Sequence, residues 1–128
     1  MTSRKSFEDR MQAYKEAQRQ LSEQLADIGF IWQGSIQRRM LSCGKAGCAC
    51  QSDPHARHGP YVYWTRKEHQ KTVAKLLTEE EADLYEEWIE NRKHLEGIVC
   101  EMKKLSRRAE KTVLTLRARA KRSKKAET

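Results

Sequence analysis

Three of the chain's four cysteines fall within eight residues, and two histidines follow them directly. The spacing reads Cys43-x4-Cys48-x-Cys50-x4-His55-x2-His58. Zinc prefers four tetrahedral ligands, and three thiolates with one imidazole are among its usual structural sets. Gly44 and Gly47 let the backbone turn tightly between the cysteines. The spacing therefore predicts a metal-binding loop over residues 43–59 that holds one structural zinc ion per chain.

The fourth ligand of this loop is expected to be a histidine. We predict His58, because the Gly59-Pro60 step and a following strand would anchor it, and we keep His55 as the alternative. The paired C-x-x-C knuckles of a zinc ribbon are missing, so the motif leaves other interpretations open. These are three free cysteines, an iron–sulfur cluster and a catalytic cysteine–histidine pair. No third catalytic member or oxyanion group is evident, so we expect no enzyme.

Composition is lean for a globular core. A length of 128 residues limits the chain to one domain at most. Because the residues are only 38% hydrophobic and 34% are charged, a bound metal would add stability that a small core does not supply. The first residues lack the apolar stretch of a signal peptide, and no run of about 18 apolar residues predicts a membrane span. We therefore expect a cytoplasmic protein with reduced thiols, which favours metal binding over disulfides.

The N-terminal segment, residues 1–29, is expected to be a heptad helix over residues 4–28 with Gly29 as its C-cap. Its apolar residues recur at spacings of three and four, with Gln18 filling the one gap. They are Phe7, Met11, Tyr14, Leu21, Leu25 and Ile28. Such a stripe predicts packing against another helix, within the chain or in a homodimer.

The segment 30–78 is expected to form a small antiparallel sheet that carries the cysteine loop at one corner. Residues 30–42 alternate in polarity, with Gly34 as a candidate bulge. Residues 60–67 and 71–77 are rich in β-branched and aromatic side chains and are separated by a short polar link, which predicts a hairpin.

A long C-terminal helix is expected over residues 79–122, followed by a disordered tail at 123–128. Thr78 and Glu81 have the spacing of a capping box, and one glycine, Gly97, rarely ends a helix. The helix would be about 60 Å long, so its later half must project, pair with the N-terminal helix or pair with another subunit. Cys100 is expected to be an ordinary, part-buried helix residue. The fold class is therefore α+β.

The net charge of +8 comes from the last 28 residues, which contain 11 basic and 3 acidic side chains, whereas residues 1–100 contain 15 of each. Nucleic-acid phosphates are the commonest partners of such a basic segment. There are two alternatives: a solvated helix end, or an amphipathic helix docked on a protein partner. Binding to a membrane surface is disfavoured because few large apolar residues accompany the charges. The candidate nucleic-acid contacts here are Lys103, Lys104, Arg107, Arg108, Lys111, Arg117, Arg119, Lys121 and Arg122.

A second candidate nucleic-acid surface lies on the hairpin. Tyr61 and Tyr63 share one face of their strand, while Val62 and Trp64 share the other. One face could present aromatic rings to unpaired bases, and ordinary sheet packing would explain the same aromatics. The basic residues assigned to this surface are Arg38, Arg39, Arg66 and Lys67.

The stretch CGKAGCACQSDPHARHGPYVYWT resembles the core of an uncharacterised bacterial domain family with the pattern C-G-[KR]-P-G-C-x-C…H-G-P-Y-x-x-W-[TS]. The resemblance covers about residues 30–95. Ala46 stands where the family commonly has proline, which loosens the turn without removing a ligand. The positions that match the pattern are Cys43, Gly44, Gly47, Cys48, Cys50, His58, Gly59, Pro60, Tyr61 and Trp64.

This resemblance implies a layout but no activity. Family members are short proteins with a helix, a strand, the cysteine loop, a hairpin and a long charged helix, and they often neighbour transposases or integrases of mobile elements. We therefore expect a zinc-stabilised, non-enzymatic accessory protein that binds nucleic acid, DNA rather than RNA. The alternative is a protein-interaction or oligomerisation module that uses its heptad helices, with a basic tail that only solubilises it.

Overall fold

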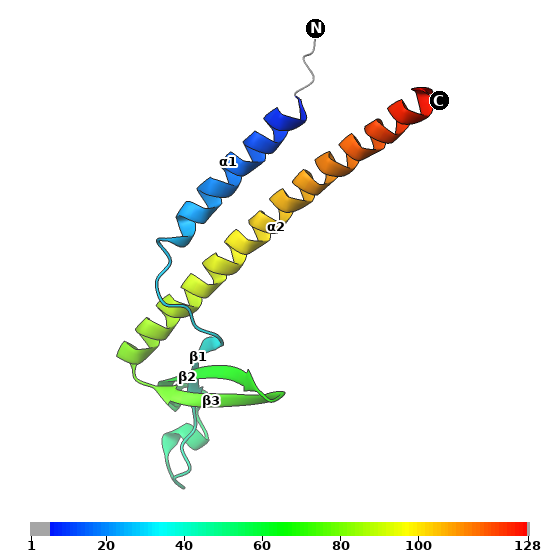
Figure 1. The fold of residues 1–128 in the computed structure, drawn as a ribbon. Coiled ribbons are helices and arrows are strands. Elements are labelled where there is room, and N and C mark those ends of the chain that lie inside the picture. Colours follow the sequence, from blue (N-terminus) through cyan, green and yellow to red (C-terminus); the bar gives the residue numbers. More distant parts are fainter. Residues whose placement is uncertain (1–5, 128) are drawn as a thin grey trace. The chain divides into compact units, whose positions relative to one another are not determined.

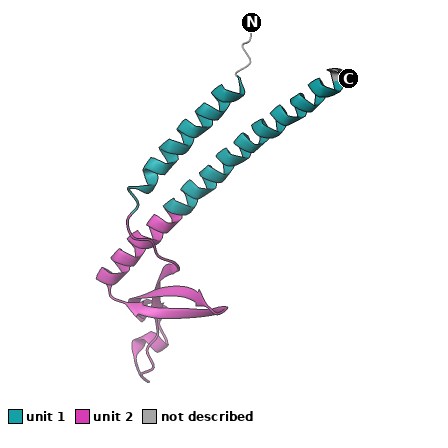
Figure 2. Ribbon diagram, in the orientation of Figure 1, with its two compact units in different colours: residues 1–28, 94–128 teal, residues 29–93 magenta. Residues whose placement is uncertain are grey.

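The computed structural model describes residues 6–127 and has the expected α+β architecture, with an N-terminal helix, a three-stranded antiparallel sheet and a long C-terminal helix (Figure 1). It divides into two compact units, one from Gly29 to Lys93 and the other made of the chain up to Ile28 and from His94 onward (Figure 2). The elements are α1 (Phe7–Leu25), β1 (Ser35–Leu41), the 3-10 helices η1 (Ala49–Gln51) and η2 (Pro54–Ala56), β2 (His58–Glu68), β3 (Lys71–Leu77) and α2 (Glu79–Glu127).

Helix α1 begins at Phe7 and ends at Leu25, three residues earlier than the apolar pattern predicted. Ser6 is its N-cap, and the Ser6 hydroxyl accepts a hydrogen bond from the Asp9 N–H at 3.2 Å. Residues 4 and 5 of the expected helix lie outside the described residues. At the other end the helix closes with Ala26 as its C-cap, so Gly29 does not cap it. The reason is local: successive N–H groups after Leu25 bond to carbonyls three residues back, which ends the α-helical pattern.

The sheet has the order β1-β2-β3, and each neighbouring pair is antiparallel. The predicted hairpin between β2 and β3 is confirmed, and its two-residue turn has His69 and Gln70 at φ values of 50° and 68°. Positive φ at both positions defines a type I′ turn, whose twist matches that of the flanking strands. The bulge lies between Arg39 and Leu41 of β1 and not at Gly34.

Strand β1 begins at Ser35, so the expectation of an extended strand from residue 30 was wrong. The segment before it is hydrogen-bonded to α2 and not to the sheet. The Trp32 N–H donates to the Trp88 carbonyl at 3.1 Å. The Asn91 amide donates to the Phe30 carbonyl at 2.8 Å. Tertiary contacts with a helix about 60 residues away therefore override the local alternation of polarity.

A small core holds the unit from Gly29 to Lys93 together. Side chains of β2 alternate between faces, and Val62 and Trp64 point to the face that the first turns of α2 cover. A chain of aromatic contacts links Trp32 to Trp64 with ring centroids 5.7 Å apart, and Trp64 to Tyr85 at 5.1 Å. The buried cluster consists of Val62, Trp64, Leu77, Ala82 and Ile89, with Ile36 and Tyr85 packed against it.

Helix α2 starts with the predicted capping box. The Thr78 hydroxyl accepts from the Glu81 N–H, and the Glu81 carboxylate accepts from the Thr78 N–H, both at 3.1 Å. The helix passes through Gly97 and continues to Glu127. Residues 123–127 are therefore helical, where the sequence predicted a disordered tail. No helix within residues 6–127 combines the length and apolar character needed to cross a membrane.

Helix α1 and the C-terminal half of α2 belong to the same compact unit. The Tyr14 hydroxyl lies 3.3 Å from the Thr112 hydroxyl, and the predicted stripe of α1 is half-buried. No residue of α1 is fully buried. The two helices therefore contact each other without the close side-chain packing that a coiled coil requires.

Candidate metal centre

Four side chains converge at the end of the sheet that carries the cysteine loop. Cys43 follows β1, Cys48 is the N-cap residue that precedes η1, and Cys50 is the middle residue of η1. His58 is the first residue of β2, so the sheet fixes its position. Gly47 has a φ of +86°, a conformation that favours glycine and that lets the chain turn between Cys43 and Cys48.

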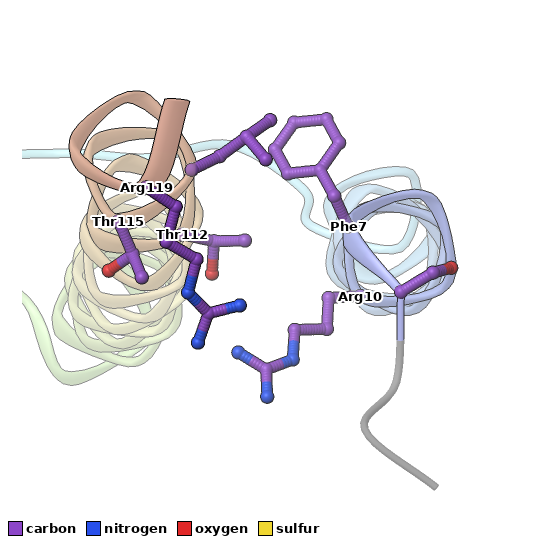
Figure 3. Close-up of a pocket in the computed structure, with 7 residues that line it drawn as sticks. Phe7, Arg10, Thr112, Thr115 and Arg119 are labelled. Carbon is purple, nitrogen blue, oxygen red and sulfur yellow. The ribbon is translucent and has the colours of Figure 1, made fainter. Parts of the chain in front are cut away.

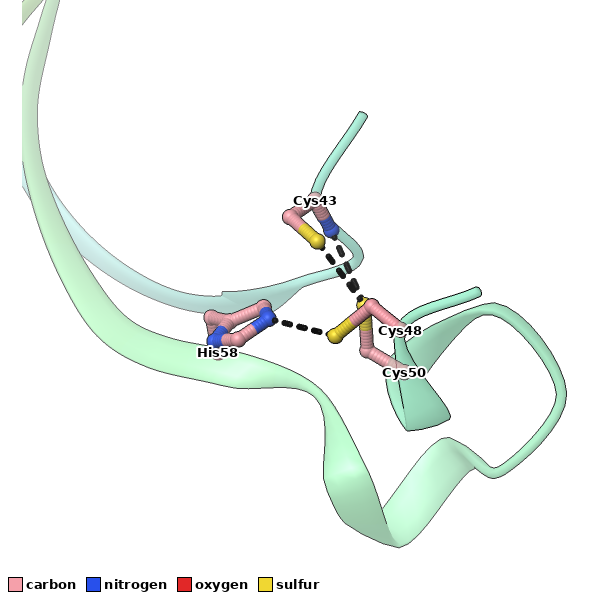
Figure 4. Close-up of side chains that lie close together, drawn as sticks. All are labelled: Cys43, Cys48, Cys50 and His58. Carbon is pink, nitrogen blue, oxygen red and sulfur yellow. Dashed lines mark hydrogen bonds between the residues drawn. The ribbon is translucent and has the colours of Figure 1, made fainter. Parts of the chain in front are cut away.

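The ligand atoms of these four residues all lie within 4.8 Å of one another (Figure 4). The Cys43 and Cys50 sulfurs are 3.3 Å apart, and the Cys48 sulfur is 3.3 Å from His58 Nε2. Four ligands placed tetrahedrally around zinc at normal bond lengths would be separated by about 3.5–3.8 Å. The cluster could therefore hold a metal ion with only small movements of its ligands.

Backbone N–H groups make this loop favourable for thiolates. The Cys43 N–H donates to the Cys50 sulfur at 3.2 Å, and the Gln51 side chain donates to the Cys43 carbonyl. A hydrogen bond from the Lys45 N–H lowers the pKa of Cys43, and a weaker contribution in the same direction comes from the Cys50 thiol. A hydrogen bond from the Cys50 N–H lowers the pKa of Cys48, and a weaker contribution in the same direction comes from the His58 ring. Gln51 is a supporting residue that the cysteine spacing gave no reason to select.

Cys50 is the most enclosed ligand, with 4% of its surface exposed. The Cys43 N–H lowers the pKa of the Cys50 thiol, but burial and the neighbouring Cys43 and Cys48 sulfurs outweigh it, so that the pKa is raised. A bound divalent cation would reverse this balance, because a coordinating thiol is deprotonated. A bound metal ion would therefore favour the thiolate form of Cys50.

A family model for a domain of unknown function, DUF6788, matches residues 11–86, which include the whole sheet and all four cluster residues. The chain belongs to the DUF6788 family. This agrees with the uncharacterised family that the sequence suggested, while the detailed motif and a bacterial origin stay predictions. No curated protein and no solved structure matches the chain. The last 42 residues of the sequence lie beyond the matched DUF6788 region.

His55 and Cys100 lie outside the cluster. His55 is an exposed residue of η2, and its N–H donates to the Asp53 carboxylate at 2.9 Å as part of a helix cap. Cys100 is exposed on α2, where the sequence predicted partial burial. In this DUF6788 chain the metal-ligand candidates are therefore Cys43, Cys48, Cys50 and His58.

The four basic sheet residues do not form one surface. The Arg38 guanidinium bonds to Glu86 at 2.5 Å and to Glu79 at 3.3 Å, and these bonds raise its pKa. Arg66 lies over the Trp64 ring at 4.1 Å, on the helix-covered face of the sheet. Arg39 lies over the Tyr63 ring at 5.5 Å.

Strand register places Arg39 and Lys67 on the same face of the sheet as Tyr61 and Tyr63. Arg38 and Arg66 are on the opposite face, so the expectation that all four line one surface was wrong. The sequence contained a sign of this, because Arg66 is an even number of residues from Val62 and Trp64 on the same strand and therefore lies on their face of the sheet.

The basic residues of the long helix are exposed. This holds for all nine that the sequence selected on α2, from Lys103 to Arg122. Lys104 bonds to Glu101 at 3.1 Å, within its own helix. The remaining positive charges therefore face solvent on the part of this DUF6788 chain that follows the matched region.

Proposed function

We propose that the Cys43, Cys48, Cys50 and His58 cluster binds one zinc ion with a structural role. Three thiolates and one imidazole complete a tetrahedral set, and catalytic zinc sites keep one position open for water. The small core of the sheet unit supports the same assignment, because ligand binding supplies folding free energy that burial does not. A non-catalytic role for the metal follows from this closed ligand set.

We further propose that the protein binds nucleic acid through the basic part of α2, DNA in preference to RNA. The observation that carries this proposal is the charge of residues 111–125, which include seven basic and no acidic side chains, all seven exposed. Phosphates release condensed counterions when such a segment neutralises them. Arg39 and Lys67, beside Tyr61 and Tyr63, offer a second contact on the sheet. An accessory role in the DNA transactions of a mobile element stays a prediction from the sequence resemblance.

The basic segment is expected to control the salt dependence of binding. A variant with glutamine at four positions (Arg117, Lys121, Arg122 and Lys124) should bind duplex DNA much more weakly at low salt. The slope of log affinity against log salt should fall by about 3 to 4 in magnitude, because each lost phosphate contact removes about one unit. Fluorescence anisotropy over a salt series, with duplex DNA and the matching RNA, measures both.

The control for this experiment carries Lys15→Gln and Arg19→Gln, which remove exposed charges from α1. It should retain nearly the full slope. Weak binding by the unmodified protein that does not change with salt would contradict the proposal. So would an unchanged slope in the four-site variant.

A second candidate function is a protein-interaction or oligomerisation module. The observation that favours it is the half-buried stripe of α1, in which no residue is fully buried. A second copy could cover that stripe. Sedimentation equilibrium tests this candidate: a dimer that a Met11→Glu substitution dissociates would support it, and a monomer at all concentrations would exclude self-association.

A further inference from the structure

A pocket between α1 and the C-terminal half of α2 brings together two arginines that are 109 positions apart (Figure 3). Both helical segments belong to the same compact unit. The pocket has a volume of about 350 Å³. Its lining residues are Ser6, Phe7, Arg10, Thr112, Thr115, Leu116 and Arg119.

The guanidinium groups of Arg10 and Arg119 point toward each other across this pocket. Neither forms an ion pair with a carboxylate of residues 6–125. Two positively charged guanidinium groups that face each other across a pocket repel each other. An anion placed between them would turn this repulsion into two charge-assisted contacts.

The other lining groups suit a phosphate that carries an organic substituent. The N-terminus of α1 adds the positive end of a helix dipole, since its N-cap Ser6 and its first residue Phe7 line the pocket. Phe7 and Leu116 give another part of the pocket an apolar wall. The volume is within the range of small-molecule sites and exceeds the need of a bare phosphate ion.

We infer that the pocket binds a nucleotide unit, with its phosphate between Arg10 and Arg119 and its sugar or base against Phe7 and Leu116. This inference rests on the proposed nucleic-acid binding and extends it, since it assigns a defined seat for one phosphate of the strand. Arg119 lies within the basic segment of residues 111–125, so a bound strand can continue from the pocket along that segment. Arg10 is a contact that the charge pattern of the sequence did not indicate.

The test compares Arg10→Gln and Arg119→Gln with Arg19→Gln. Arg19 is, like Arg10, an exposed residue of α1, but it does not line the pocket and it pairs with Glu16 at 3.6 Å, so its replacement removes the same charge elsewhere. The probe is a labelled single-stranded DNA of about 15 nucleotides, a length that one binding module can cover. Each pocket variant should weaken binding about 10-fold or more, as expected for lost hydrogen bonds to a charged group, and the control less than 2-fold.

A conservative variant separates a phosphate seat from general electrostatic attraction. Arg10→Lys keeps the charge but loses the planar fork that bonds two oxygens at once. We expect it to restore only part of the affinity that Arg10→Gln loses. Full restoration, or equal losses in Arg10→Gln and Arg19→Gln, would overturn the inference while leaving nucleic-acid binding by the basic segment intact.

Thermal unfolding gives a readout that does not depend on strand binding. AMP should raise the midpoint of the helical transition in the unmodified protein, because a ligand that binds the folded state stabilises it. Sodium chloride at equal ionic strength should not reproduce this rise, and Arg10→Gln should abolish it. Stabilisation by AMP without oligonucleotide binding would support the pocket and contradict the proposed function. No rise with AMP and no effect of Arg10→Gln on the oligonucleotide would overturn the inference.

Discussion

Removal of the metal is expected to unfold the sheet unit, and tryptophan fluorescence should report this event selectively. All three tryptophans, Trp32, Trp64 and Trp88, lie between Gly29 and Lys93. Structural zinc contributes an apparent binding free energy of about 10–16 kcal/mol at neutral pH, which is comparable to or larger than the whole stability of a typical domain. A chelator should therefore shift tryptophan emission to longer wavelength as the rings become hydrated.

The cysteine outside the cluster supplies a matched control. Cys48→Ser should reproduce the emission shift without chelator, because it removes a ligand. Cys100→Ser removes an exposed thiol of α2 and should leave both the emission and the response to chelator unchanged. An unmodified protein whose emission does not respond to exhaustive chelation would contradict a structural role for the metal.

Replacement of Trp64 by alanine should cause the largest loss of stability among substitutions in the core. The Trp64 side chain is 5% exposed, and its Nε1 donates to the Gln33 carbonyl at 2.9 Å. Its ring contacts Trp32 and Tyr85, and the Arg66 guanidinium lies over it. We expect the free energy of unfolding to fall by about 3–5 kcal/mol, as is usual for a buried aromatic side chain.

Urea unfolding at fixed zinc concentration, followed by circular dichroism, measures this loss. The control is Leu76→Ala, since Leu76 is 58% exposed on β3 and should contribute less than about 0.5 kcal/mol. Trp64→Phe should lie between the two, because it keeps an aromatic ring and loses the hydrogen bond to Gln33. Equal effects of Trp64→Ala and Leu76→Ala would show that Trp64 does not hold the core.

Local chemistry made much of this fold predictable. The Thr78 and Glu81 pair marks a helix start by its own hydrogen bonds, and these depend on four consecutive residues only. The hairpin follows from two β-rich runs joined by a short polar link. His58 was preferable to His55 because the Gly59-Pro60 step leads directly into a strand, and the structure places His58 beside the sulfurs.

The features that the sequence could not predict depend on contacts between segments that are distant along the chain. Phe30 and Trp32 have a strand-like spacing, yet their backbone bonds to α2 and leaves the sheet to begin at Ser35. The meeting of Arg10 and Arg119 depends on how two helices align, and no local pattern encodes that alignment. The helix over residues 123–127 continues α2, although a charged chain end favoured disorder.

The zinc site is tested by the metal content of untagged protein, purified without added metal and measured by elemental mass spectrometry. We predict about one zinc ion per chain, lost in Cys43→Ser and in His58→Ala but retained in His55→Ala. His55 is the matched control, since it is a histidine of the same loop outside the cluster. Protein without metal, whose three clustered thiols all titrate freely, would contradict the structural zinc site.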